Sequence, residues 1–278
     1  MFINRSEIKV TPSVIIGCEG KGTEAVVRCR DLVQQEIFRG NPDALRDFDP
    51  LQFLVVDSGP QPLESSGTDH GIETLSIAFD RIERVIDNPD FPASGSGVVK
   101  ILRQMPEFRD YKGMLTALPS SSLGNSTCPP LGAMNFLASW NSIKEGLRAR
   151  LMYWKQESKT GIKTNDWKKY NQIFIVAGLF GGTGSGTHIH LAAMLRSLLA
   201  ELEIPNTAIY GIFLLPDIIE NADDAGKMKL RANAYSCLKE LDHFLSGNPY
   251  TLEMDTKKLI VSNTTKDMLF NKVFLVND

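Results

Sequence analysis

The feature that most constrains the fold is an apolar run that leads directly into a glycine-rich segment. Residues 173–179 are apolar and partly β-branched, and the six residues 181–186 contain four glycines. Apolar residues with helical spacing follow from Ile189 to Leu199. Glycines let a chain turn sharply and approach an anion closely, and a helix N-terminus offers free N–H groups and a positive dipole end. The pattern predicts a strand, an anion-binding loop and a helix, with a tight turn or close helix packing as the alternative.

Composition narrows the class of protein. The 278 residues are 42% apolar and 23% charged, with a formal net charge of −3, as is ordinary for a globular chain with a full core. The mixed charges predict neither a nucleic-acid surface nor a polybasic membrane patch. No apolar run approaches the ~20 residues of a membrane span. The four cysteines, at positions 18, 29, 128 and 237, are widely spaced, which favours reduced thiols and a cytoplasmic location.

A second strand–glycine–helix unit lies near the N-terminus. Residues 14–16 form a short apolar strand, residues 17–24 are rich in glycine, and apolar positions from Ala25 to Val33 predict a helix. The Gly-x-x-Gly-x-Gly spacing of this loop matches neither the dinucleotide fingerprint nor the P-loop. Lys21 in the loop either neutralises phosphate charge or is an ordinary solvated lysine.

Three further strands are predicted from near-continuous apolar runs at residues 51–56, 207–215 and 273–276, a pattern typical of strands buried on both faces. Asp57 and Ser58 directly follow the first of these runs. Ligands in open α/β sheets bind at the carboxyl ends of the strands. These two residues therefore either contact a ligand or only cap a turn.

The rest of the pattern completes an α/β fold. Amphipathic spacing predicts helices over residues 72–86, 133–156 and 223–245, and residues 106–131 are expected to be mostly loop.

Two alternating stretches, 250–254 and 258–262, predict a hairpin at the sheet edge. Repeated strand–loop–helix units predict a doubly wound, mostly parallel sheet with helices on both faces. We expect one domain over residues 1–278.

Two residue patterns superficially suggest a metal site and a catalytic nucleophile, and neither has the required arrangement. His188 and His190 lie two residues apart in a predicted helix, so they face different directions and are poorly placed to share a metal. The run Gly182 to Gly186 superficially resembles the nucleophile elbow, but glycine occupies the nucleophile position. We therefore predict no catalytic residue and no protein-bound metal in this chain.

The glycine segment carries a family resemblance. Residues 181–186 read Gly-Gly-Thr-Gly-Ser-Gly and resemble the GGGTG(S/T)G signature of the tubulin/FtsZ superfamily, with Phe180 where that family usually begins its glycines. Residues 233–235 and 238–241 resemble a divergent bacterial tubulin-like family more than FtsZ itself. The other segments that resemble the superfamily, in chain order, are residues 16–26, 53–63, 216–220, 233–241 and 273–278.

The resemblance implies GTP or GDP across the carboxyl ends of the strands, with Mg²⁺ bound through the nucleotide. Gly182 to Gly186 would form the main phosphate cradle, residues 95–97 would face the γ-phosphate, and Glu220 would hydrogen-bond the ribose. Hydroxyls of Thr183 and Ser185 would reach the phosphates or Mg²⁺. The full set of implied contacts is Gly17, Gly20, Lys21, Gly22, Asp57, Ser58, Gly95, Ser96, Gly97, Gly181, Gly182, Thr183, Gly184, Ser185, Gly186, Glu220 and Asn277.

The chain also departs from the family pattern. Glu19 replaces a loop glycine, and Glu24 stands where the family commonly has an asparagine that reads the base. The sequence stops at Asp278, where the family continues into its central helix and then into a loop that supplies a catalytic acid to the neighbouring subunit. We therefore expect a nucleotide-binding front part of a longer filament-forming GTPase, or else a reduced binding module.

Two other functions stay open at this stage. A Rossmann-like dinucleotide-binding oxidoreductase would use an acid at the end of its second strand to bind a ribose, a role open to Asp57. A non-catalytic interaction module of the same fold is favoured by the acidic residues Glu19 and Glu24 in the first loop.

Overall fold

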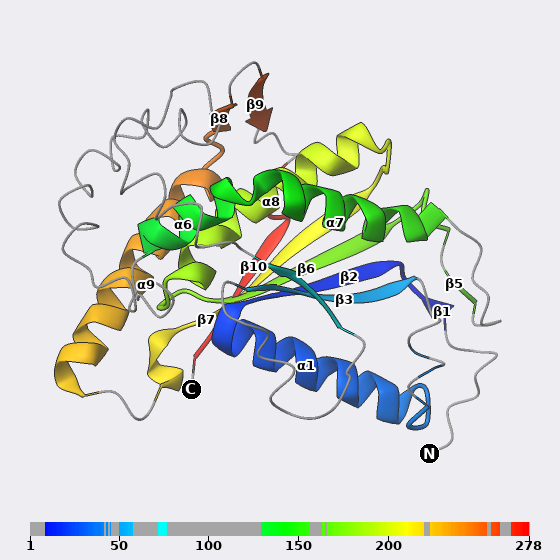
Figure 1. The fold of residues 1–278 in the computed structure, drawn as a ribbon, viewed down its shortest axis with the longest axis horizontal. Coiled ribbons are helices and arrows are strands. Elements are labelled where there is room, and N and C mark those ends of the chain that lie inside the picture. Colours follow the sequence, from blue (N-terminus) through cyan, green and yellow to red (C-terminus); the bar gives the residue numbers. More distant parts are fainter. Residues whose placement is uncertain are drawn as a thin grey trace.

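The computed structural model describes residues 9–41, 43, 45, 50–57, 72–76, 129–155, 163–164, 166–219, 223–254, 257–261 and 268–277. At its centre is a six-stranded sheet in which every neighbouring pair is parallel (Figure 1). In spatial order the strands are β10 (Lys272–Val276), β7 (Thr207–Leu214), β6 (Asn171–Gly178), β2 (Ser13–Cys18), β3 (Leu51–Asp57) and β4 (Glu73–Ser76).

The strand order reverses in the middle of the sheet, an arrangement that leaves a crevice at the carboxyl ends of the two central strands. Within this sheet the first strand in sequence is β2, and the next two, β3 and β4, are added outward on one side. The chain then returns to the other side of β2 with β6 and continues outward through β7 to β10. β2 and β6 are paired in register, with Gly17 opposite Val176 and Cys18 opposite Ala177. In sheets wound in this way, the gap between the connections that leave two such central strands is the usual ligand site.

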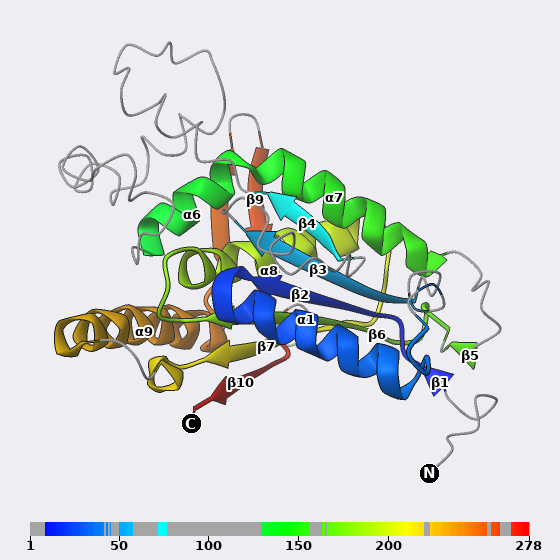
Figure 2. The ribbon, with the colours of Figure 1, turned by 60° about the horizontal axis from the view of Figure 1, so that its bottom comes forward.

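Helices cover both faces of the sheet, as predicted. α1 (Glu19–Glu36) lies along one face and packs on β2, β3 and β6. α6 (Pro129–Ala138), α7 (Trp140–Met152) and α8 (Thr183–Glu201) lie on the other face (Figures 1 and 2). α9 (Asp224–Leu245) packs beside α8.

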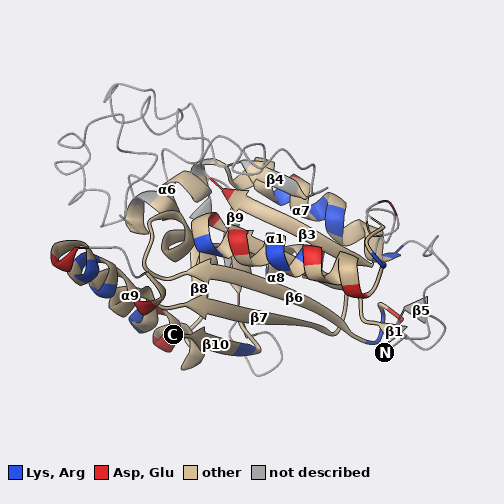
Figure 3. Cartoon of the chain, turned by 90° about the horizontal axis from the view of Figure 1, so that it is seen from below, with Lys and Arg blue, Asp and Glu red and all other residues tan. Residues whose placement is uncertain are grey.

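Side chains of a single strand point into two different buried clusters, one on each face of the sheet, which accounts for the apolar strand sequences. Ile173 and Ile175 of β6 face the larger core under α8, whereas Val176 faces a smaller core that includes Val26 of α1. Because both faces are covered, most residues along β6 are buried, and the strand reads as a continuous apolar run. α1 and α9 carry charges of both signs on their outer surfaces (Figure 3). Among the described residues, no helix has the length and apolar character needed to cross a bilayer.

The prediction of a helix over residues 72–86 is wrong at its start. Glu73–Ser76 is strand β4, which pairs in parallel with Leu54–Asp57 of β3. A segment of four residues is too short for its side-chain spacing to distinguish a strand from a helix, and here pairing with the open edge of β3 decides in favour of the strand. Residues 77–86 lie outside the described part of the chain.

The long helix predicted over residues 133–156 is two helices. The first begins at Pro129, a residue whose fixed φ and missing N–H suit the first turn, so the predicted loop ends earlier than expected. Ser139, with φ −98° and ψ 9°, interrupts the helical backbone between α6 and α7. A 3₁₀ turn, η4 (Tyr153–Lys155), follows α7.

The last strand is exposed rather than buried. β10 pairs with β7 at the end of the sheet, and Phe274, Leu275 and Val276 are 42%, 50% and 38% exposed. Its apolar sequence was interpreted as burial on both faces, but α1 lies over β2, β3 and β6, on the other half of the sheet.

Two small sheets stand apart from the main one. The predicted hairpin forms as β8 (Tyr250–Met254) and β9 (Lys257–Val261), an antiparallel pair with its own sheet, so it does not extend the main sheet edge as expected. β1 (Lys9–Val10) and β5 (Lys163–Thr164) form a short parallel pair that the sequence did not indicate.

Arg196 of α8 supports a prediction about stability. Its guanidinium donates to the carbonyls of Met268 (2.7 Å) and Thr207 (2.8 Å) and to the side-chain oxygen of Asn271 (2.6 Å). Because hydrogen bonds from charged groups contribute about 1.5–3 kcal/mol, we expect Arg196→Met to lower the free energy of unfolding by roughly 2–3 kcal/mol. Urea denaturation measures this loss.

The matched control is Arg148→Met on α7. Arg148 forms ion pairs with Glu201 and Glu145 at the surface, and such exposed pairs contribute about 1 kcal/mol or less. Equal losses for the two variants would contradict the role assigned to Arg196.

Candidate functional site

Two helix N-termini meet at the carboxyl ends of β2 and β6. α1 follows Cys18 without a separate loop, and four residues separate the end of β6 from the start of α8 at Thr183. The helix predicted from Ile189 therefore starts earlier, and much of the glycine segment forms its first turn. The predicted strand, glycine-rich loop and helix are present, with the loop shorter than expected.

A carboxylate from α1 caps the N-terminus of α8. Oε2 of Glu19 accepts hydrogen bonds from the backbone N–H groups of Thr183 (2.9 Å) and Gly184 (3.2 Å). The Thr183 side chain also hydrogen-bonds this carboxylate, and this contact favours its charged form. The N-cap residue of α8, Gly182, has no side chain for the task, so Glu19 satisfies donors that the helix leaves free. The predicted phosphate cradle thus binds an anion from its own chain.

The backbone at Glu19 is in an unfavourable conformation. Glu19 has φ 48°, and Gly20 after it has φ 42° and ψ −113°. The left-handed region is readily open to glycine, but it costs residues with a Cβ roughly 1–2 kcal/mol. The backbone at position 19 therefore suits glycine, and glutamate is a costly choice there.

The environment of Glu19 disfavours its charge. Burial raises the pKa of the Glu19 carboxyl, and the nearby negative charge of Asp57 raises it further, while the hydrogen bonds from Thr183 and Gly184 lower it. Asp57 is 5% exposed and lies at the end of β3, beside β2. The structure thus brings two of the acidic residues noted in the sequence to one end of the sheet.

The glycines of the two loops divide into two groups. A Cβ at Gly181 would lie 3.6 Å from Glu19 Oε2, so this glycine borders the anion position. A Cβ at Gly186 would lie only 2.5 Å from the amide nitrogen of Ala133 in α6, and one at Gly184 would lie 2.9 Å from the carbonyl of Gly178. Close packing, the alternative interpretation of the sequence, therefore accounts for these two glycines.

Glycines of the first loop show the same packing role. A Cβ at Gly17 would lie 2.6 Å from the carbonyl oxygen of Gly22, and one at Gly22 would collide with the carbonyl of Val176 in β6. These two glycines let α1 start directly against the sheet. Gly20 has open space around it and differs from them in requiring a positive φ.

Other predicted contacts are placed as follows. The Ser185 hydroxyl of α8 donates to the carbonyls of Gly181 and Gly182, which immediately precede the helix. Lys21 is exposed and forms an ion pair of 2.7 Å with Glu24. Asn277 is exposed just after β10. The remaining predicted contacts, Ser58, Gly95, Ser96, Gly97 and Glu220, lie outside the described residues.

Sequence reasoning missed the residues that support the cradle from outside. The Asn233 side chain of α9 donates to the carbonyl of Phe180 (3.0 Å), and the thiol of Cys237 donates to the carbonyl of Ser185 (3.7 Å). Both residues lie in the helix predicted over residues 223–245, and no local pattern marked either as a contact. For Glu19 the available signal was an acidic residue inside a glycine-rich strand–helix junction.

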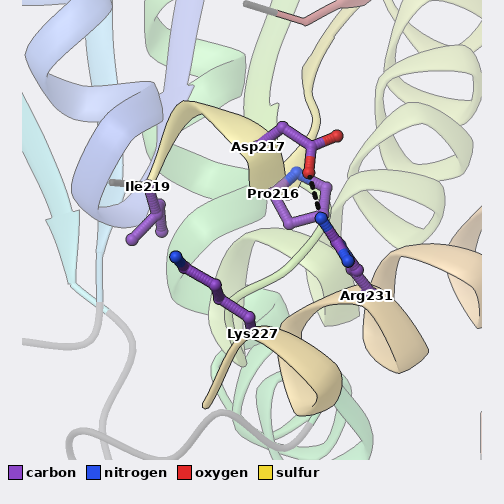
Figure 4. A pocket seen from close by; sticks show the side chains of 5 residues that line it. All are labelled: Pro216, Asp217, Ile219, Lys227 and Arg231. Carbon is purple, nitrogen blue, oxygen red and sulfur yellow. Dashed lines mark hydrogen bonds and ion pairs between the residues drawn. The ribbon is translucent and has the colours of Figure 1, made fainter. Parts of the chain in front are cut away.

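A small pocket of about 170 Å³ lies at the end of β7 (Figure 4). It is bordered by the 3₁₀ turn η5 (Pro216–Ile218) and by Lys227 and Arg231 of α9, and Arg231 forms an ion pair of 3.0 Å with Asp217. The side chain of Lys227 extends toward Ile219 (Figure 4). The pocket therefore brings two cationic side chains to the segment that precedes the predicted ribose contact, Glu220.

The paired histidines of the sequence belong to the core. His188 packs edge-on against Phe213, and the Nδ1 of His190 lies 2.6 Å from the Tyr250 hydroxyl. Burial lowers the pKa of both histidines to about 4, so both are neutral at pH 7. Within the described ranges, no group of three or more His, Cys, Asp and Glu side chains is arranged to hold a metal ion.

The raised pKa of Glu19 predicts how stability changes with pH. The folded protein holds this proton more tightly than the unfolded chain, so unfolding becomes easier as pH rises from the unfolded pKa, near 4.3, through the folded value. Relative to Glu19→Gln, wild-type protein should be most stable below that window and lose stability across it. Thermal melts of both proteins from pH 4 to pH 8 measure the difference, and a difference that is constant with pH would contradict the prediction.

The two groups of glycines predict a contrast between two alanine variants. Gly186→Ala places a Cβ against the backbone of α6, so we expect a loss of several kcal/mol in the free energy of unfolding. Gly181→Ala meets only an ordinary contact, so its loss should stay within about 1 kcal/mol. Urea denaturation compares the two, and equal losses would show that the division is wrong.

Comparison with known proteins identifies the family. Residues 14–278 match a family model described as Tubulin like. A search of curated proteins found no match. Among solved structures, the chain is similar to a mutant of FtsZ from M. jannaschii (16% identity, TM-score 0.38) and to CetZ2 from Haloferax volcanii in a GTPγS-bound protofilament (16% identity, TM-score 0.40).

The FtsZ match covers 84% of this chain and 44% of the FtsZ chain, and the CetZ2 match covers 86% of this chain and 63% of the CetZ2 chain. The present chain therefore spans less than two thirds of either. The family model, by contrast, extends from β2 to the end of the sequence. The chain belongs to the Tubulin like family and has an α/β fold built on a parallel sheet.

Proposed function

We propose that this chain is the GTP-binding part of a tubulin/FtsZ-like protein that assembles into filaments. Membership of the family supports the proposal. The observation that carries it is the contact at the start of α8, where two backbone N–H groups and the Thr183 side chain bind a carboxylate. Donors that bind a carboxylate oxygen can also bind a phosphate oxygen in its place, because both accept the same hydrogen bonds.

In this proposal the phosphates lie against the start of α8. The N–H groups of residues 181–184 and the Thr183 hydroxyl hold them, and residues 20–22 approach from the side of α1. Mg²⁺ enters with the nucleotide and offsets phosphate charge beside Asp57. The contacts at Ser58, residues 95–97, Glu220 and Asn277 stay predictions.

Hydrolysis is assigned to the assembled filament, where a neighbouring subunit supplies the catalytic acid. The task of this chain is to bind and orient the phosphates. The proposal includes a single nucleotide-binding domain over residues 1–278 and a cytoplasmic location, both predictions from the sequence.

Titration with fluorescent GTP, ATP and NADH in the presence of Mg²⁺ tests the proposal. We expect GTP to bind with a Kd below about 100 μM, a modest requirement that corresponds to roughly −5.5 kcal/mol. Binding of NADH but not GTP would favour the dinucleotide-binding alternative, for which Asp57 at the end of β3 is the relevant acid. If GTP, ATP and NADH all fail to bind, the result would favour the non-catalytic interaction module.

A variant tests the position of the phosphates. Thr183→Val removes one donor from the cradle, and we expect it to weaken GTP binding by about five- to tenfold, the effect of one lost hydrogen bond. Thr251→Val is the control, since Thr251 is exposed on β8, in a different sheet. Unchanged GTP affinity in Thr183→Val would place the phosphates elsewhere.

A further inference from the structure

We propose that Glu19 is an internal competitor for the phosphate site, so that a nucleotide binds only when the Glu19 carboxylate leaves the N-terminus of α8. The inference rests on the proposed function, because it concerns control of the same site. It goes beyond that function because it makes Glu19 of α1 the residue that controls how readily the site accepts phosphate.

The contact uses the donors that a phosphate needs. Glu19 Oε2 lies 2.9 Å from the N of Thr183 and 3.2 Å from the N of Gly184, and the Thr183 side chain also contacts the carboxylate. Gly181, where a Cβ would make only an ordinary van der Waals contact, borders the same oxygen. A phosphate oxygen and this carboxylate oxygen therefore cannot occupy the position together.

The backbone conformation supports a specific role for this side chain. A glutamate at φ 48° is less favourable than the glycine that the position suits, and glycine follows it directly at position 20. Strain of this kind persists when the surrounding structure, or the function, requires the residue. Here the strained backbone aims the carboxylate across the crevice at α8.

The contact is also built so that it can be released. Glu19 is only half-buried, and Gly20 is exposed with open space where a side chain would lie. Burial and the charge of Asp57 both disfavour the ionised carboxyl at this position, which raises its pKa. A strongly charged phosphate with its cation therefore competes against a weakly held anion, and the apparent affinity falls by the fraction of molecules in which Glu19 occupies the site.

Two substitutions at one position test the proposal by isothermal titration calorimetry with GTPγS and Mg²⁺. Glu19→Gln removes the charge and keeps the shape, and Glu19→Gly removes the whole side chain and suits the backbone. We expect Glu19→Gly to bind GTPγS at least tenfold more tightly than wild type, and Glu19→Gln to bind more tightly by a smaller factor. Glu36→Gln is the control, since it makes the same charge change at the exposed far end of α1, and its affinity should stay within twofold of wild type.

The outcomes separate this inference from the proposed function. If wild type binds GTPγS and Glu19→Gly binds equally or less tightly, Glu19 does not compete and the inference fails while the proposed function stands. If neither wild type nor Glu19→Gly binds, the proposed function fails, and the inference fails with it.

Hydrogen exchange supplies a test that needs no nucleotide. In ligand-free wild type, the N–H groups of Thr183 and Gly184 should exchange slowly, because Glu19 covers them. In Glu19→Gly we expect both to exchange at least tenfold faster, while amides in the middle of α8 keep their rates and show that the variant is folded. Equal exchange at Thr183 and Gly184 in the two proteins would overturn the proposal.

Discussion

The pairing of β2 with β6 is the constraint on which the rest of the molecule depends. These neighbours lead into helices on opposite faces of the sheet, α1 on one side and α8 on the other. Two helix N-termini therefore open toward the same crevice, and their unpaired N–H groups must be satisfied there. A side chain from one unit, Glu19, meets that need for the other.

Close approach of backbone to backbone makes this pairing possible. α1 begins against β2 and β6 because positions 17 and 22 lack a Cβ, and α8 begins against α6 because position 186 lacks one. The glycines that draw attention in the sequence thus serve mainly to bring rigid elements together, and the free N–H groups are a consequence of that approach. Binding capacity at this edge and stability of the fold are therefore difficult to change separately.

The sequence predicted most of the central sheet, and its failures have physical causes. β2, β3, β6 and β7 were found because burial on both faces produces long apolar runs, and α9 because one apolar face repeats along it. β4 was missed because four residues are too few to show the two-residue period of a strand. The exposure of β10 was missed because apolar character alone does not tell which elements cover a strand. The Glu19 contact was beyond reach because it joins residues 164 positions apart.

The order of the chain also has a kinetic consequence. β6, α8 and β7 are consecutive and can form by local contacts, whereas Gly17 must find Val176 across more than half of the sequence before β2 is in place. Long-range parallel pairing of this kind is slow. The crevice is therefore completed late in folding, and a ligand that binds there recognises only molecules whose two halves have joined.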